Sequence, residues 1–150
     1  MKIEIIKKTL LKESVKKTIL EGVIFFEKKL VSKKILKKAF FKQKLLIVFV
    51  SSSEMKKLNQ YFFKKNSTTD ILSFSAVEKN SLGELVLCVQ KIRSQAKDHN
   101  LSFQEEMIYL ILHGLLHLLG YHHEQGGKKA ERMYRIQDSI FESWQKKFVN

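Results

Sequence analysis

Hydrophobic and polar residues alternate at the start of the chain and then change to a helical spacing. Residues 2–7 alternate between apolar and charged side chains, which predicts a β-strand with one covered face. From about Leu10 to Phe41, apolar residues recur at helical spacing with pairs of lysines between them. This spacing predicts one or two basic amphipathic helices. Residues 45–50 are β-branched, aromatic or leucine, which predicts a buried strand.

A helix and two strands are predicted in the middle of the chain. Ser52 or Ser53 can cap the first turn of a helix that includes residues 55–62, because a serine hydroxyl accepts a hydrogen bond from a free backbone N–H. Residues 70–74 and 83–89 are short segments rich in β-forming side chains. We expect these two segments to pair as neighbouring strands.

Helices dominate the last part of the chain. Residues 90–99 have helical spacing, and Ser102 with Glu105 forms a capping box ahead of an apolar helix that reaches Leu119. Gly126-Gly127 precedes a last helix whose apolar residues share one side: Met133, Ile136, Ile140, Phe141 and Trp144. Strands that alternate with helices, followed by helices alone, favour an α+β fold. In this fold a mixed sheet of about four strands is covered by helices.

The length and composition of the chain favour one domain in the cytoplasm. With 150 residues, 44% of them hydrophobic, the chain can form a core without disulfides. Its longest apolar runs are far shorter than the ~20 residues that cross a bilayer, and its alternating N-terminus lacks the apolar region of a signal peptide. Cys88 is the single cysteine, which we expect to be buried. We expect a single domain over residues 1–150, without a membrane partner.

Basic side chains are abundant and unevenly placed. The net charge is +13, and residues 1–44 hold 14 lysines and four glutamates, whereas residues 101–150 hold six basic and six acidic residues. A positive surface attracts polyanions, because contacts with phosphates release bound counterions. The alternative is that lysine pairs only solvate the outer faces of helices. The charge favours nucleic acid as a partner.

Four of the five histidines lie between residues 113 and 123. His113 and His117 are four positions apart, so their rings share one helix face with Cβ atoms about 5–6 Å apart. Gly120 can end this helix and turn the chain back, so that His123 supplies a third nitrogen. Three imidazoles and one open position are typical of a catalytic zinc ion, which activates a bound water as a nucleophile. If the helical histidines were only buried among leucines, each ring would still need a polar partner.

The same spacing occurs in metzincin peptidases, with one difference. Their pattern His-x-x-x-His-x-x-Gly-x-x-His has glutamate directly after the first histidine, and this glutamate is the general base. Gly114 occupies that position here and can transfer no proton. Glu124 follows the third histidine and is a possible substitute, although a glutamate beside a helix end is more often simply exposed. A metallopeptidase is therefore kept only as an alternative.

With Gly114 in place, residues 113–123 resemble the signature of the YbeY family, His-Gly-x-Leu-His-Leu-x-Gly-Tyr-Asp-His. The chain departs from it at His122, where aspartate is usual. Leu58-Asn59, Lys65 and residues 69–74 resemble the block that ends Thr-Asp-Val-Leu-Ser-Phe in the family, and residues 82–87 resemble its Leu-Gly-Asp-Ile strand. The resemblance extends from about residue 45 to the end of the chain.

The resemblance implies an α+β fold and a metal-dependent endoribonuclease. It implies one zinc ion per chain, at the end of the long central helix, with His113, His117 and His123 as its ligands. It further implies single-stranded RNA as substrate, in the maturation of small-subunit ribosomal RNA and in ribosome quality control. The alternative is an RNA- or ribosome-binding assembly factor whose metal is mainly structural.

One position departs from the family in a way that bears on catalysis. Family members usually carry arginine where this chain has Phe63. An arginine there would hold a phosphate by two parallel hydrogen bonds, which phenylalanine cannot do. Lys64 and Lys65 lie beside it and can replace the charge as single cations. We expect Lys65 to be the catalytic phosphate contact, and the phenylalanine itself favours the assembly-factor alternative.

Other polar and aromatic residues have two interpretations. Asp70 is either a catalytic carboxylate or an aspartate that fixes a turn by accepting backbone hydrogen bonds. The phenylalanine pairs at residues 25–26, 40–41 and 62–63 are either core residues or platforms on which nucleobases stack. Aromatic residues at helical spacing favour the core. His99 is isolated from the other histidines, and we expect it at the surface.

Overall fold

A mixed sheet of four strands forms the centre of the fold in the computed structural model, which describes residues 1–37, 40, 42–124 and 126–150. The strands lie in the order β1-β2-β4-β3. Strands β1, β2 and β4 are parallel, and β3 is antiparallel to β4 at one edge. The strand bounds are β1 Lys2–Lys7, β2 Lys44–Val50, β3 Ile71–Ser75 and β4 Ser81–Cys88. This confirms the predicted mixed sheet and the predicted pairing of the two middle segments.

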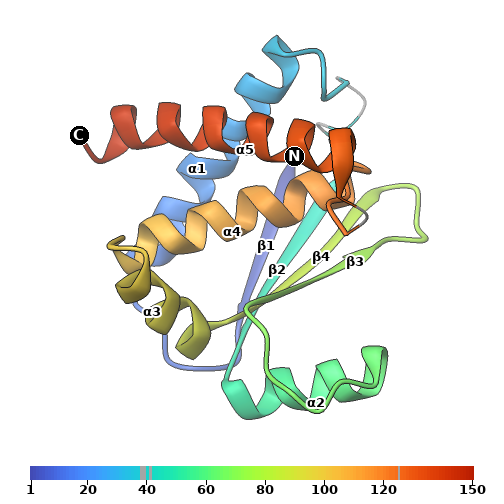
Figure 1. Cartoon of the computed structure of the whole chain (residues 1–150), viewed down its shortest axis with the longest axis vertical. Helices are drawn as coiled ribbons and strands as arrows, with labels where there is room; N and C mark the ends of the chain where they lie inside the picture. Colours follow the sequence, from blue (N-terminus) through green and yellow to red (C-terminus); the bar gives the residue numbers. More distant parts are fainter. Residues whose placement is uncertain (38–39, 41, 125) are drawn as a thin grey trace.

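The helices cover the two faces of the sheet unequally. Their bounds are α1 Ser14–Ser32, α2 Ser52–Phe63, α3 Val89–Asp98, α4 Phe103–Leu118 and α5 Gly127–Phe148. Leu45, Ile47 and Phe49 of β2 face the large core that contains α1, α4 and α5. Val48 and Val50 face the smaller core beneath α2. Figure 1 shows α4 and α5 running side by side, with α2 well apart from them.

Helix starts differ from the sequence expectation at two places. The first helix begins at Ser14, and Leu10 lies outside it with an exposed side chain. It ends at Ser32, well before Phe41, which lies outside the described residues. The N-cap of α2 is Ser51, and neither of the two serines that follow it has this role. The Ser51 hydroxyl accepts a hydrogen bond from Glu54 N–H at 3.3 Å. Strand β2 ends one residue before this cap.

Helix α4 is anchored at its start and buried along most of its length. The Ser102 hydroxyl accepts from Glu105 N–H at 3.1 Å, and the Glu105 carboxylate accepts from Ser102 N–H at 3.2 Å, as the capping box predicts. The helix packs against α1, α3, α5 and the strands β3 and β4. Within the part of the chain that the structure describes, neither this nor any other helix is long and apolar enough to span a membrane.

One carboxylate of α4 is buried and has a histidine as its partner. Glu106 is 1% exposed, and its Oε2 lies 2.9 Å from Nδ1 of His99. The histidine is exposed, as expected, and it is also the partner of this buried carboxylate. The hydrogen bond to Glu106, followed by the charge of that carboxylate, raises the pKa of His99 above its ordinary value. The pair ties the end of α3 to the first turns of α4.

This pair predicts a pH-dependent stability. The pKa of His99 is higher in the folded state than the value of about 6.5 expected in the unfolded state. The ion pair therefore contributes its full stabilisation below the unfolded pKa, and this stabilisation is lost as pH rises through the folded pKa. We expect His99→Gln to lower the free energy of unfolding by about 1 kcal/mol near pH 6 and by less near pH 9. Urea denaturation at both pH values measures this, with Lys97→Gln as the matched surface control. An equal loss at both pH values would contradict the charged pair.

Candidate metal centre

Three histidines converge where α4 ends. His113 and His117 lie on the last turns of the helix, and Nε2 of one lies 3.0 Å from Nε2 of the other. Gly120, with φ of 98°, turns the chain back, and His123 joins them with ring centroids 5.0 and 4.9 Å away. One nitrogen of each ring lies within 4.8 Å of the others. The structure therefore brings together the three residues that the sequence predicted as ligands.

The protonation state of the two helical histidines is compatible with metal binding. Burial is the largest cause that lowers the pKa of His113, and it lowers the pKa of His117 to about 4 with the neighbouring His113 adding to the effect. Both rings are therefore neutral at physiological pH, the form in which imidazole binds metal. Nδ1 of His123 is buried without a hydrogen-bond partner among the described residues. Three imidazole nitrogens that converge in this way form a site suited to zinc.

A buried glutamine orients the first histidine. Oε1 of Gln137, a fully buried residue of α5, accepts a hydrogen bond from Nδ1–H of His113 at 2.8 Å. The proton is thereby held on Nδ1, so the lone pair of Nε2 points to the other two rings. Sequence reasoning missed Gln137. The signal was present, since this polar residue lies four positions after Met133 on the apolar side of α5.

The three imidazoles lie in a cleft of about 710 Å³ whose opposite wall comes from the middle of the chain. Phe63, Lys65 and Asp70 line this wall. The segments that resemble one family in sequence therefore face one another across a single cavity. Lys65, predicted from sequence as the phosphate contact, and the histidines share this space.

The loop that carries Lys65 is held by a buried asparagine. Lys64 follows the last residue of α2 as its C-cap and takes the left-handed conformation with φ of 54°. Beyond it, Lys65 N–H donates to the carbonyl of Asn59 at 3.3 Å. Nδ2 of the same asparagine donates to the carbonyl of Ser67 at 2.8 Å. Asn59, visible in sequence only as part of a motif, thus joins the helix end to the cleft wall.

The structure bears on the two residues, Asp70 and Phe63, that the sequence left with two interpretations. Oδ1 of Asp70 accepts from Ile71 N–H at 2.7 Å, which is the backbone-fixing role, although the residue also lines the cleft. A catalytic role for it stays a prediction. Phe63 is 47% exposed and is not a core residue. Phe25 and Phe26 are buried in the core.

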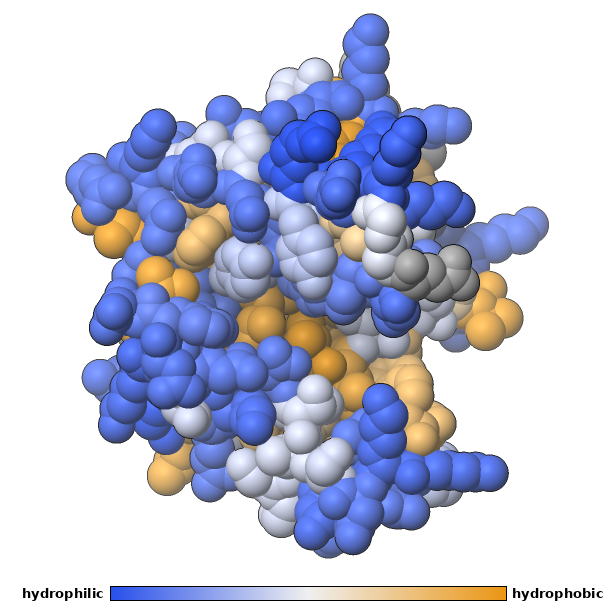
Figure 2. All heavy atoms as spheres, in the orientation of Figure 1, coloured by the Kyte–Doolittle hydropathy of each residue, from blue (hydrophilic) through white to orange (hydrophobic). Residues whose placement is uncertain are grey.

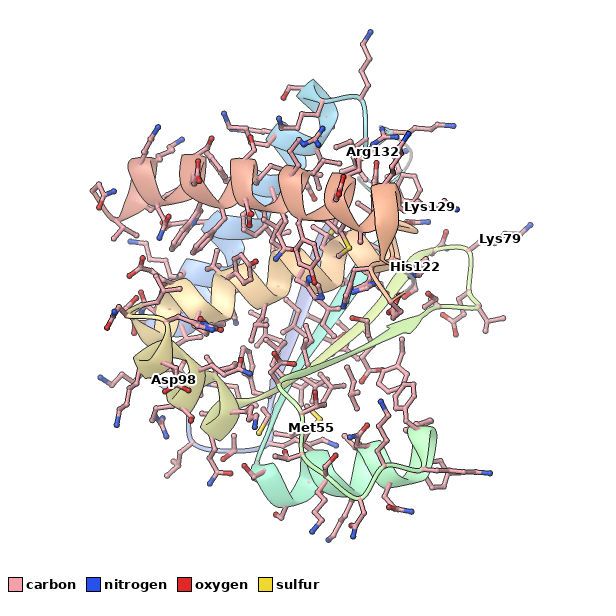
Figure 3. The ribbon with its side chains drawn as sticks, in the orientation of Figure 1. Met55, Lys79, Asp98, His122, Lys129 and Arg132 are labelled. Atoms are coloured by element: carbon pink, nitrogen blue, oxygen red, sulfur yellow. The ribbon has the colours of Figure 1, made fainter. Side chains whose placement is uncertain are left out.

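His122 and Glu124 lie at the opening of the cleft. Figure 3 labels His122 in the loop between α4 and α5. Its Nδ1 lies 4.0 Å from Oε2 of Glu124, and both side chains are about two thirds exposed. A hydrogen bond from its own backbone N–H is the largest cause that lowers the pKa of Glu124. His117 also forms a possible ligand group with these two residues, but it would be a more exposed one.

Gly114 lies in close contact with side chains of the sheet. A Cβ atom at this position would lie 2.7 Å from Cδ2 of Leu85 and 2.8 Å from Cδ1 of Ile71. These distances are shorter than any ordinary contact between carbon atoms. The side of α4 that carries the metzincin base is therefore the side that packs on β3 and β4, and a glutamate there would displace these side chains and bury its carboxyl among apolar groups.

Comparisons with known proteins point to one family. A family model described as "Endoribonuclease YbeY" matches residues 3–145. The protein of that name from Bdellovibrio bacteriovorus is 51% identical over 83 residues, which are 55% of each chain. The one from Petrotoga mobilis is 42% identical over 78 residues, or 51% of this chain and 54% of that one. The chain thus spans, in these alignments, about half the length of the curated relatives it matches.

A solved structure is similar over a longer stretch. The solution structure of a Thermotoga maritima protein has a TM-score of 0.66 with this fold and 28% sequence identity. The similarity covers 97% of this chain and 91% of that one. The α+β arrangement is therefore shared with a solved protein over most of the chain.

The packing of Gly114 predicts that a metzincin base cannot be introduced here. We expect Gly114→Glu to lower the free energy of unfolding by about 3 kcal/mol or more, because it overfills the contact and buries a carboxyl without a partner. Thermal or urea unfolding measures the loss, and a casein assay tests for peptidase activity. Lys128→Glu, at an exposed position in the first turn of α5, is the control. A stable Gly114→Glu variant with peptidase activity would contradict the packing argument.

Proposed function

The chain belongs to the YbeY endoribonuclease family, and on this premise we propose that it is a zinc-dependent endoribonuclease acting on single-stranded RNA. One zinc ion per chain is held by His113, His117 and His123. The observation that carries the proposal is the single cleft, which is lined both by these three imidazoles and by Lys65.

The residues of the cleft have separable roles in the proposed reaction. A bound zinc ion would polarise a phosphoryl oxygen and activate water for attack on the phosphodiester. Gln137 keeps the proton of His113 on Nδ1, so that its lone pair is free for the metal. Lys65 offers an ammonium to a non-bridging oxygen of the same phosphate, in place of the usual arginine. Asp70 and Glu124 are the carboxylates among the lining residues that could accept the water proton.

Ribosomal RNA of the small subunit is the proposed substrate, with ribosome maturation and quality control as the setting. The family membership and the net charge of +13 support this proposal. The assembly-factor alternative is favoured by Phe63, which removes the arginine clamp. An open cleft with half-buried histidines favours the enzyme, because structural zinc sites are closed by four protein ligands.

The first prediction concerns metal binding and needs no catalytic readout. We expect wild type to bind one zinc ion per chain and His117→Ala to lose it. Gln137→Leu should weaken zinc binding by about 10- to 100-fold, because it removes the acceptor that orients His113. Gln137→Glu keeps an acceptor and should restore binding. Competition with a chromophoric chelator measures the affinities, with Gln60→Leu on the surface of α2 as control. Full zinc affinity in Gln137→Leu would remove its positioning role.

The second prediction separates the enzyme from the assembly factor. In single-turnover cleavage of unstructured RNA with saturating zinc, His113→Ala should abolish cleavage but leave most of the salt-dependent RNA binding. Lys65→Ala should raise the barrier by about 2–4 kcal/mol, the scale of one lost oxyanion donor. Phe63→Arg should cleave faster than wild type, since a two-pronged donor returns to the phosphate. Lys79→Ala, on the turn between β3 and β4, is the matched lysine control (Figure 3).

The outcomes of this assay are distinct. If wild type cleaves no faster than His113→Ala, the assembly-factor proposal replaces the enzyme. If wild type cleaves and Lys65→Ala equals Lys79→Ala, another cation contacts the phosphate.

A further inference from the structure

Four aromatic rings form an exposed cluster beside the metal cleft. Tyr61, Phe62 and Phe63 end helix α2, and Phe74 lies on the edge strand β3; we name these four residues the aromatic patch. The first three side chains are 79%, 52% and 47% exposed. Ring centroids lie 4.8 Å apart for Tyr61 and Phe62, and 5.0 and 6.1 Å from Phe74 to Phe62 and Phe63. Phe74 is partly buried against the smaller core beneath α2, whereas the other three rings stay exposed.

The fold does not require this arrangement. Helix α2 buries only Met55 and Asn59 completely among its described residues. Successive residues of a helix point about 100° apart, so three consecutive aromatic residues cannot all face the sheet. Exposed aromatic rings in contact with one another are uncommon on a surface without a binding role. The sequence expectation that residues 62–63 belong to the core is therefore wrong for both rings.

The aromatic patch is continuous with the metal cleft and lies among cations. Phe63 lines both the cleft and an adjoining hollow of about 290 Å³. Four exposed lysines lie on the same helix, α2, or directly after it: Lys56, Lys57, Lys64 and Lys65. Figure 2 shows hydrophobic surface between α2 and the helices above it, bordered by hydrophilic side chains. Exposed aromatic rings and cations on the same element match a ligand that has aromatic faces and a negative backbone.

We propose that the aromatic patch is a subsite on which unpaired nucleobases of an RNA strand stack, while the backbone of the strand passes Lys65 into the metal cleft. This inference rests on the proposed function, since RNA is the occupant. Stacking on aromatic side chains and contact of phosphates with lysines are how sequence-tolerant single-strand sites work. The bases of a duplex are already stacked on one another and cannot reach the rings. The patch would thus select single strands, and Phe63 becomes a binding residue where relatives carry arginine.

The test compares side chains that differ in having an aromatic face. We would titrate zinc-loaded protein into short oligouridine carrying one 2-aminopurine, whose emission falls when it stacks, and record binding by stopped flow before turnover. Tyr61→Leu and Phe62→Leu keep the apolar area and should each weaken binding about 5- to 100-fold with less quenching. Tyr61→Phe and Phe62→Trp keep the ring and should bind like wild type. Phe148→Leu, another exposed aromatic residue on α5, is the control.

An abasic oligonucleotide separates stacking from charge. We expect it to bind weakly and equally to wild type and to both leucine variants, with the dependence of affinity on salt unchanged by these variants. Thermal unfolding confirms that the variants are folded, as their exposed positions predict. The proposal is overturned if the leucine variants bind oligouridine like wild type, or if the abasic strand loses affinity in parallel; the second result would indicate an indirect effect on the loop.

The result is independent of the catalytic proposal. Ring-dependent binding without zinc-dependent cleavage would retain the stacking subsite and refute the endoribonuclease. Zinc-dependent cleavage together with RNA binding that does not depend on the rings would retain the endoribonuclease and refute the stacking subsite. If RNA does not bind at all while a protein partner requires the same rings, the patch is a protein-docking surface and the stacking proposal is wrong.

Discussion

The close approach of α4 to the structure around it is the constraint on which the site depends. Gly114 lets the helix lie directly on Leu85 and Ile71 of the sheet. On the α1 side, Gly22 leaves room for Ile108, since a Cβ there would lie 2.7 Å from Cδ1 of this isoleucine. Rotation of α4 about its axis would bring a side chain larger than Gly114 against the sheet, which the close packing of the core opposes. The directions of His113 and His117 are therefore set by the core.

The part of the site that could be predicted from sequence is the part carried by α4 and the turn after it. Residues His113, Gly114, His117, Gly120 and His123 lie within one short segment whose geometry follows from helix periodicity and a glycine turn. The strands and the Ser102 capping box are local patterns of the same kind. Elements of this type are predictable because each is decided by neighbours in the chain.

The parts that sequence reasoning missed depend on contacts between distant segments. Gln137 meets His113 only because α5 packs along α4, and His99 meets Glu106 only because α3 folds back on it. Three serines in a row made the start of α2 ambiguous, and the end of β2 at Val50 decides it. The exposure of Phe62 likewise follows from how little of α2 the sheet covers. Periodicity alone cannot report such tertiary choices.

The position of β3 has a consequence for how this fold can change. β3 is the edge strand, and Ser73 and Ser75 on it line the cleft. The usual way to protect an edge strand is to pair it with another strand or to cover it. Either addition would close the cleft beside the histidines. An open site and a protected edge are thus in conflict here, so insertions that enlarge the sheet are compatible with access to the cleft only at the opposite edge, beyond β1.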